Sequence, residues 1–274
     1  MKAPDFDYLR PSTLDEALTM IAEYQGDAMP LAGGQSLMPM MNFRIAAPEA
    51  LIDLADVVEL QGIIQESDSI RIGAMTRYAQ LMSDPVILAS IPLFGLALPH
   101  IAHDAIRNRG TIGGSLALAD PAAEMPALML VLNATIEITG KTGTRKIKAD
   151  EFFLGYFDTA LEEEELIVAI HIPTPAADHQ FGFYELTQRH GDYAIAGVAV
   201  AFRTNCYRVA FFGVSDRAIR VPAVENALAR GDGMDTVVTH LNDIEFSGDL
   251  KASKITRQRL AKVALGRAIE GMTL

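Results

Sequence analysis

Residues Leu31–Leu37 read LAGGQSL and residues Thr111–Pro121 read TIGGSLALADP, so a glycine pair followed closely by serine occurs twice. Adjacent glycines let the backbone turn its N–H groups to one side, because no Cβ atom interferes. Such N–H groups bind anions, and a serine adds a hydroxyl donor. The predicted donors are Gly33, Gly34, Gln35 and Ser36 in the first segment and Thr111, Gly113, Gly114 and Ser115 in the second. Together the segments could hold both phosphates of a dinucleotide, although each pair alone is also typical of a tight turn.

The charge of the chain agrees with phosphate binding by neutral amides. Its 274 residues include 35 acidic and 23 basic ones, a net charge of −12, which argues against a nucleic-acid partner. Neither a G-x-G-x-x-G pattern after a strand nor a G-x-x-x-x-G-K-[ST] pattern is present. A nicotinamide-type Rossmann site and an NTPase site are therefore not supported.

The cysteine and histidine residues limit which disulfides, metal sites and iron–sulfur clusters the chain can form. Cys206 is the only cysteine, so this chain alone can build no internal disulfide, thiolate zinc site or iron–sulfur cluster. We interpret Cys206 as a small hydrophobic residue that enters a strand. His100 and His103 have a spacing compatible with one metal ion, but no third ligand is nearby, so we predict no metal site. No apolar run is long enough to span a membrane and the N-terminus does not resemble a signal peptide, so we expect a cytoplasmic protein.

Hydrophobic patterns divide the chain into three predicted segments. Residues 1–55 contain an amphipathic helix over 12–25, a short strand before the first glycine pair and a strand over 50–54, which indicates a small α/β unit. Residues 56–175 contain a hairpin that turns at Ser67–Ser69, a helix over 76–90 with Thr76 as its cap, and a helix over 96–106. A second hairpin over 134–153 and a strand over 165–173 complete this segment.

The third predicted segment, residues 176–274, begins within a linker over 174–180. It contains strands over 194–202 and 207–214 and helices near 221–229 and over 253–270. The last helix shows an apolar stripe that includes Leu260, Val263 and Ala264 beside a cationic face. This pattern indicates an α+β unit of its own.

Several stretches together resemble one protein family. LAGGQSLMPMMNFRIAAPEALIDL and IRNRGTIGGSLALADPAAEMPALMLVL are similar to sequences in the FAD-binding medium subunits of the molybdenum hydroxylases, the carbon monoxide dehydrogenase, xanthine dehydrogenase and quinoline oxidoreductase relatives. ELIVAIHIP, RHGDYAIAGVAV and ITRQRLAKVALGRAI extend the resemblance over nearly the whole chain. It implies an α+β protein with a vanillyl-alcohol-oxidase/MurB-type FAD-binding fold. Two α/β subdomains (1–55 and 56–175) would hold FAD, and the C-terminal α+β lobe (176–274) would pair a small antiparallel sheet with helices.

The resemblance also implies which residues contact FAD. Both glycine segments wrap the pyrophosphate, an acidic residue after the second one binds cofactor hydroxyls, and a Gly-Asp-aromatic segment lies near the flavin ring. The implied cofactor-binding residues are Leu31, Ala32, Gly33, Gly34, Gln35, Ser36, Leu37, Ile101, Ala102, Thr111, Ile112, Gly113, Gly114, Ser115, Glu124, Ile167, Asp192 and Tyr193. From the residues alone, Tyr193 is more typical of a core aromatic, Asp120 of a turn, and Glu162–Glu165 of a solvated turn.

The same resemblance implies a function in electron transfer. The chain would carry FAD between [2Fe-2S] clusters on a small partner subunit and an external acceptor, with the molybdenum cofactor on a large partner subunit. A dimer of heterotrimers is the family expectation, and no side chain here is assigned a catalytic role. The alternatives are a stand-alone MurB-like flavin reductase or oxidase and a flavin-free assembly subunit. Arg107 and Arg109 would face either the phosphates or a partner.

Overall fold

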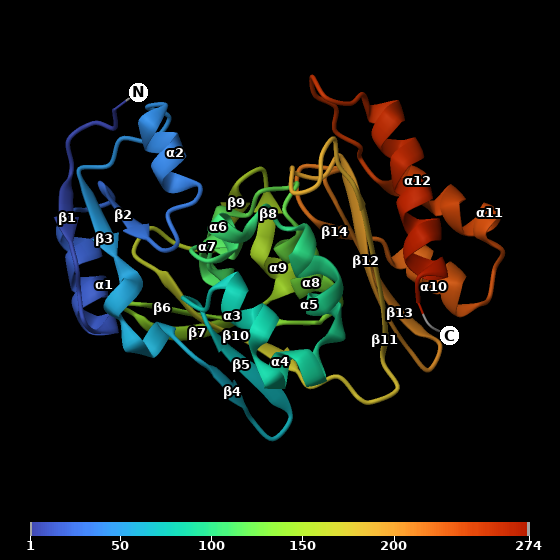
Figure 1. Ribbon diagram of the computed structural model, residues 1–274, viewed down its shortest axis with the longest axis horizontal. Helices are drawn as coiled ribbons and strands as arrows, with labels where there is room; N and C mark the ends of the chain where they lie inside the picture. Colours follow the sequence, from blue (N-terminus) through green and yellow to red (C-terminus); the bar gives the residue numbers. More distant parts are fainter. Residues whose placement is uncertain (1, 273–274) are drawn as a thin grey trace.

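The computed structural model describes residues 2–272 and arranges them around three successive β-sheets (Figure 1). A three-stranded sheet comes from the N-terminal part, a five-stranded sheet from the middle and a four-stranded sheet from the C-terminal part. A two-stranded ribbon, β8 (Phe153–Gly155) with β9 (Asp158–Thr159), follows the middle hairpin. Helices and sheets both contribute throughout, so the α+β class expected from the sequence is confirmed.

The N-terminal sheet is parallel, with the strand order β1-β3-β2. Its elements are β1 (Asp7–Leu9), α1 (Leu14–Glu23), β2 (Ala28–Leu31), α2 (Leu37–Asn42) and β3 (Ala50–Asp53). Helix α1 forms as predicted, because Thr13 caps it by accepting a hydrogen bond from Glu16 N. Ala17, Leu18 and Ile21 form its buried face. The strand β2 runs directly into the first glycine segment.

The middle sheet is antiparallel and contains both predicted hairpins. Its strand order is β4 (Ile63–Gln65), β5 (Ser69–Gly73), β10 (Leu166–Pro173), β6 (Thr135–Gly140) and β7 (Gly143–Lys148). Short helices accompany it: α3 (Tyr78–Ser83), α4 (Pro85–Ser90), α5 (Pro92–Ala97), α6 (Asp104–Arg107), α7 (Ile112–Leu118), α8 (Glu124–Val131) and α9 (Ala149–Phe152). Single turns of 3-10 helix lie at Leu54–Asp56, Val58–Leu60 and Leu98–His100.

Two of the predicted helices in this region are wrong as continuous elements. The 76–90 segment breaks at Asp84, whose carboxylate caps a new helix that begins with Pro85. Thr76 is not the cap, because the preceding helix starts at Tyr78. The 96–106 segment breaks after Ala97, and Ala102 adopts a positive φ of 47°. Proline cannot donate a backbone hydrogen bond, so it starts helices more easily than it continues them.

The C-terminal sheet is antiparallel and follows chain order: β11 (Gln180–Leu186), β12 (Ala196–Arg203), β13 (Cys206–Phe212) and β14 (Ile219–Arg220). The helices α10 (Pro222–Ala229) and α12 (Lys254–Glu270) cover one face, with α11 (Met234–Val237) and a 3-10 segment (Val238–Asp243) beside them. Helices α5 and α8 contact the other face. The strand β11 was missed by the sequence analysis, which left most of it unassigned.

Two side-chain expectations in this part are corrected. Val263 is half exposed, and the buried stripe of α12 instead includes Ala261, Leu265 and the charged Arg257. Arg257 is held inside because its guanidinium donates to the Ile195 carbonyl and to Asp249. Cys206 begins a strand as expected, but it is exposed and does not pack as a hydrophobic residue.

The hydrophobic cores connect the three sheets. The largest core joins the middle sheet to Phe181 and Phe212 of the C-terminal sheet. Leu166 and Val168 of β10 pack into the N-terminal core. Helix α8 is buried along its whole length between these layers, which fixes the position of its first residue, Glu124.

Candidate cofactor site

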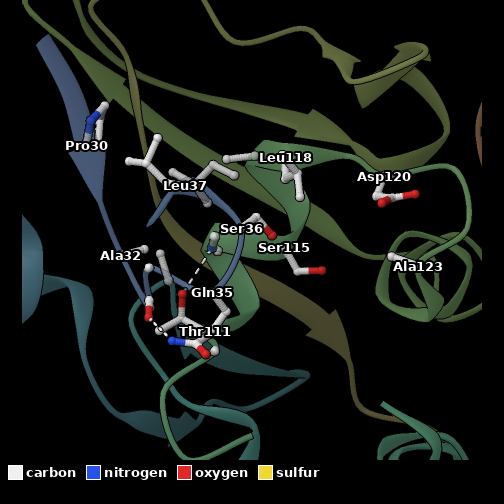
Figure 2. A pocket seen from close by; sticks show the side chains of 18 of the residues that line it. Pro30, Ala32, Gln35, Ser36, Leu37, Thr111, Ser115, Leu118, Asp120 and Ala123 are labelled. Carbon is white, nitrogen blue, oxygen red and sulfur yellow. Dashed lines mark hydrogen bonds between the residues drawn. The ribbon is translucent and has the colours of Figure 1, made fainter. Parts of the chain in front are cut away.

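A cleft of about 590 Å³ lies where the two glycine segments meet (Figure 2). This volume is in the usual range for a small-molecule or cofactor site. All the residues predicted to bind cofactor line the cleft except Leu31 and Ile112. Ile112 is fully buried in the core beneath the second segment.

The first glycine segment presents unused hydrogen-bond donors to the cleft. Within the described residues, the N–H groups of Gly33, Gly34, Gln35 and Ser36 have no acceptor. Gly34 has a φ of +71°, a conformation that favours glycine, and the Gln35 side chain donates to the Gly33 carbonyl at 2.8 Å. These four amides are the donors predicted from the sequence. Because these residues line the cleft, a ligand with anionic oxygens can accept hydrogen bonds from the unused amides.

The second glycine segment is built differently, and the predicted array of free amides there is wrong. It forms the first turn of α7, with Thr111 as the N-cap. The Gly113 N–H donates to the Ala74 carbonyl at 2.8 Å, and the Gly114 N–H donates to Thr111 Oγ1 at 3.2 Å. The Ser115 N–H donates to the Thr111 carbonyl at 3.1 Å. This segment can offer the cleft the Ser115 hydroxyl and a close backbone surface, but not these three amides.

The two segments are in direct contact. A Cβ atom added to Gly33 would lie 2.8 Å from Gly110 Cα, closer than real Cβ atoms approach. A Cβ atom added to Gly114 would lie 3.2 Å from the Ala32 Cβ. Glycine is therefore required for the approach at Gly33, and the two segments lie side by side.

A third wall comes from residues far along the chain. Gly191, Asp192 and Tyr193, in the loop after β11, reach the cleft beside Ile101 and Ala102. Tyr193 is 51% exposed, so its alternative interpretation as a core aromatic is wrong. Burial of its hydroxyl, together with Asp120 and Glu124, raises the pKa of Tyr193.

Arg107 supports this wall through hydrogen bonds to its backbone. Its guanidinium donates to the Ile101 carbonyl at 2.7 Å and to the Ala102 carbonyl at 3.0 Å, and it pairs with Asp104. These contacts account for Arg107 as a support of the 101–102 turn, and it does not line the cleft. The Arg109 side chain is exposed and does not line the cleft, while its carbonyl lies against Gly33.

Two acidic residues on the cleft wall, Asp120 and Glu124, have raised pKa values. Asp120 accepts a hydrogen bond from the Ala122 N–H, as a turn residue does, and also lines the cleft, where burial raises its pKa. Glu124 is 6% exposed. Burial, then the neighbouring Glu185, raises the pKa of Glu124 to about 8. Glu124 can therefore carry a proton at neutral pH.

Several lining residues were missed by the sequence analysis. They are Met29, Pro30, Met40, Leu54, Met75, Tyr78, Leu118, Leu161, Glu162, Glu163, Glu165 and Leu166. The solvated-turn interpretation is wrong for Glu165, whose side chain is 7% exposed and paired with Arg145. The only sequence signal that the 161–166 segment lies at the cleft was its position at the start of the strongly hydrophobic β10.

Neither a metal site nor a membrane segment is evident in residues 2–272. No group of three His, Cys, Asp or Glu side chains there could hold a metal ion. None of the described helices is both long and apolar enough to cross a membrane.

Comparison with known proteins shows the family. Residues 4–175 match the family described as "FAD binding domain in molybdopterin dehydrogenase", so the chain belongs to that family. Over 280 aligned residues it is 37% identical to caffeine dehydrogenase subunit beta of Pseudomonas sp. (strain CBB1), covering 98% of this chain and 95% of that one. It is 40% identical over 225 residues to the carbon monoxide dehydrogenase medium chain of Hydrogenophaga pseudoflava, covering 80% and 78%.

Solved structures agree over nearly the full length. A carbon monoxide dehydrogenase from Hydrogenophaga pseudoflava that lacks the Mo-pyranopterin moiety matches with a TM-score of 0.94, 36% identity and 98% coverage of both chains. Quinoline 2-oxidoreductase from Pseudomonas putida 86 matches with a TM-score of 0.93 and 36% identity, covering 98% of this chain and 97% of that one. The protein is therefore an FAD-binding medium subunit of the molybdenum hydroxylase type, a flavoprotein component of an oxidoreductase.

Proposed function

We propose that the cleft between the glycine segments is the FAD site and that the chain passes electrons from a partner's [2Fe-2S] cluster to an external acceptor. The bound flavin supplies the redox chemistry, because it accepts electrons singly and releases them as a pair. The protein supplies position and electrostatics. No side chain of this chain is required to act on the substrate.

One observation carries the proposal: Gly33 to Ser36 line the cleft, and none of their four N–H groups has an acceptor among the described residues. A pyrophosphate offers the oxygens that these donors need, and it requires no lysine or arginine in a chain of net charge −12. The opposite wall, Ser115 with Asp120 and Glu124, can bind cofactor hydroxyls. We infer that Tyr193, half exposed at the third wall, covers part of the flavin.

The partner subunits follow from the relatives. Medium chains belong to multi-subunit enzymes, and this chain has one cysteine, so it cannot bind an iron–sulfur cluster alone. We infer a small subunit with [2Fe-2S] clusters, a large subunit with the molybdenum cofactor, and a dimer of such heterotrimers. For this chain we propose three structural units, residues 1–55, 56–175 and 176–274, and we propose the cytoplasm as its location.

Purification tests these inferences in two steps. The full chain should be yellow, and the cofactor released on denaturation should be FAD, not FMN. Isolation from the native host should bring down a large molybdenum-containing subunit and a small iron–sulfur subunit. A colourless, stable complex would favour the flavin-free assembly role. Unaided turnover of the isolated chain with NAD(P)H and a small substrate would favour a MurB-like reductase.

A further inference from the structure

At the wall of the cleft, one buried carboxyl group lies beside a second that does not line the cleft. Glu124, at the start of α8, lines the cleft and is 6% exposed. Its neighbour is the carboxyl of Glu185 in β11, which raises the pKa of Glu124. The Glu185 side chain is only 2% exposed. One group comes from helix α8 and the other from a strand of the C-terminal sheet.

Glu185 interrupts an otherwise apolar face of its strand. Phe181 and Phe183, which share its side of β11, pack into the main core. An inward-facing carboxylate there is costly unless a cation or a proton compensates it. Among the described residues, neither Glu124 nor Glu185 forms an ion pair with lysine or arginine.

The hydrogen-bond pattern indicates a missing proton donor. Glu185 Oε2 is buried and has no hydrogen-bond partner among the described groups. A proton on either carboxyl would turn the pair into one donor and one acceptor. Two neighbouring carboxylates in a low-dielectric site cannot both be ionised, so such pairs retain one proton.

A histidine connects this pair to the surface. His100 Nδ1 lies 3.4 Å from Glu185 Oε1, and 37% of the His100 side chain is exposed. The His100 ring also contacts Phe183 and the edge of His190. His100, Glu185 and Glu124 therefore form a continuous series from solvent to the cleft. The other titratable groups that influence the pair are Asp120, Tyr78 and Tyr193, all on the cleft side.

We propose that Glu124 and Glu185 hold one proton between them, and that His100 exchanges it with solvent, so that the three side chains form a proton path to the wall of the FAD cleft. A proton that enters at His100 passes from Nδ1 to Glu185 Oε1 and then to Glu124. One leaves Glu124 for the cleft as another enters, so the pair keeps its single negative charge. The proposal rests on the FAD site above, because reduction of a flavin takes up protons as well as electrons.

The first test measures the shared proton directly in the full chain. Infrared difference spectra between the unsubstituted chain and Glu185→Gln should show a protonated carboxylic acid at neutral pH. In Glu185→Gln, the acid at Glu124 should titrate at a pH lower by on the order of one unit, because its anionic neighbour is gone. Absence of a protonated acid at neutral pH in the unsubstituted chain would overturn the proposal.

The second test measures the path with a surface variant that leaves the core intact. After transfer into D₂O, His100→Asn should exchange the buried acid proton at least about tenfold more slowly, because a positioned proton carrier is lost. The matched control is His103→Asn, an exposed histidine three residues away that should leave the rate unchanged. Equal rates in His100→Asn and the unsubstituted chain would contradict the path.

The third test connects the path to the flavin. In the FAD-loaded chain, the pH at which the flavin midpoint potential changes slope should move in Glu185→Gln, and it should stay in place in His103→Asn. An unmoved slope change in Glu185→Gln would show that the pair does not communicate with the cofactor. Failure of the FAD site itself would appear separately as colourless protein, while the infrared and exchange measurements still decide the proton pair.

Discussion

The two glycine segments have similar sequences but different structural roles. Residues 33–36 leave four amides without acceptors at the cleft, whereas Gly113, Gly114 and Ser115 use theirs within the protein. The first segment connects a strand to a short helix whose N-cap, Ser36, makes no side-chain capping bond. The second has a threonine cap and lies against β5 through Ala74. A glycine pair therefore indicates a close backbone approach, and its surroundings decide whether it binds a ligand or packs.

The contact between the segments gives the largest expected effect. Gly33→Ala should weaken FAD binding by between about 10- and 100-fold, because relief of an overpacked contact with Gly110 costs roughly 1–3 kcal/mol and pushes the segments apart. Titration of the flavin-free chain with FAD measures this. Gly266→Ala, in α12 with open space around it, is the matched control and should leave affinity unchanged. Normal FAD affinity in Gly33→Ala would show that the close approach is dispensable.

Backbone conformation in the first segment should have a smaller effect. Gly34 and Gly231 both have positive φ values, +71° and +77°, but only Gly34 lines the cleft. Alanine at either position should lower the free energy of unfolding by about 1 kcal/mol, because the left-handed conformation disfavours a Cβ atom. Only Gly34→Ala should also weaken FAD binding, by roughly tenfold. Chemical denaturation and FAD titration of both variants separate the two effects.

The hydroxyl groups of the two segments offer the finest distinction. Ser36→Ala should make the free energy of FAD binding less favourable by about 1 kcal/mol, because a hydroxyl donor at the cleft is lost. It should leave the free energy of unfolding unchanged, because the Ser36 hydroxyl makes no capping bond. Thr111→Val should do the reverse, costing about 1 kcal/mol of stability through the lost cap of α7, with little effect on affinity. Thermal unfolding with and without FAD measures both. If the two variants behaved alike, the two segments would not differ in role.

Local sequence signals predicted much of the fold. The helix α1, both hairpins, the strand β10 and the two long C-terminal helices follow from periodicity and capping residues, which act within a few positions. Predictions failed where prolines divided an apolar run, as at Pro85 and Pro99, since apolar periodicity alone does not show a break. The strand β11 was missed because its alternation is short and includes the inward-facing Glu185.

The candidate site was likewise predicted only in part from the sequence. Both glycine segments were found from sequence, because a glycine pair is visible in the letters. Glu165 was misjudged, since its burial beside the cleft depends on how β10 enters the middle sheet. Likewise, Tyr193 could not be distinguished from a core aromatic without knowing that its loop reaches the cleft.

By itself, the sequence determined the chemistry available: neutral amide donors in an acidic chain, one cysteine, and glycine where a backbone must approach closely. Tertiary structure alone decided which amides stay free and which carboxyls lose their counter-charges. Hydrogen-bond acceptors such as the Ala74 carbonyl, and neighbours such as Glu185, are distant in sequence and meet their partners only when the sheets pack. Free donors and shared protons are properties of that packing, because burial removes the water that would otherwise satisfy them.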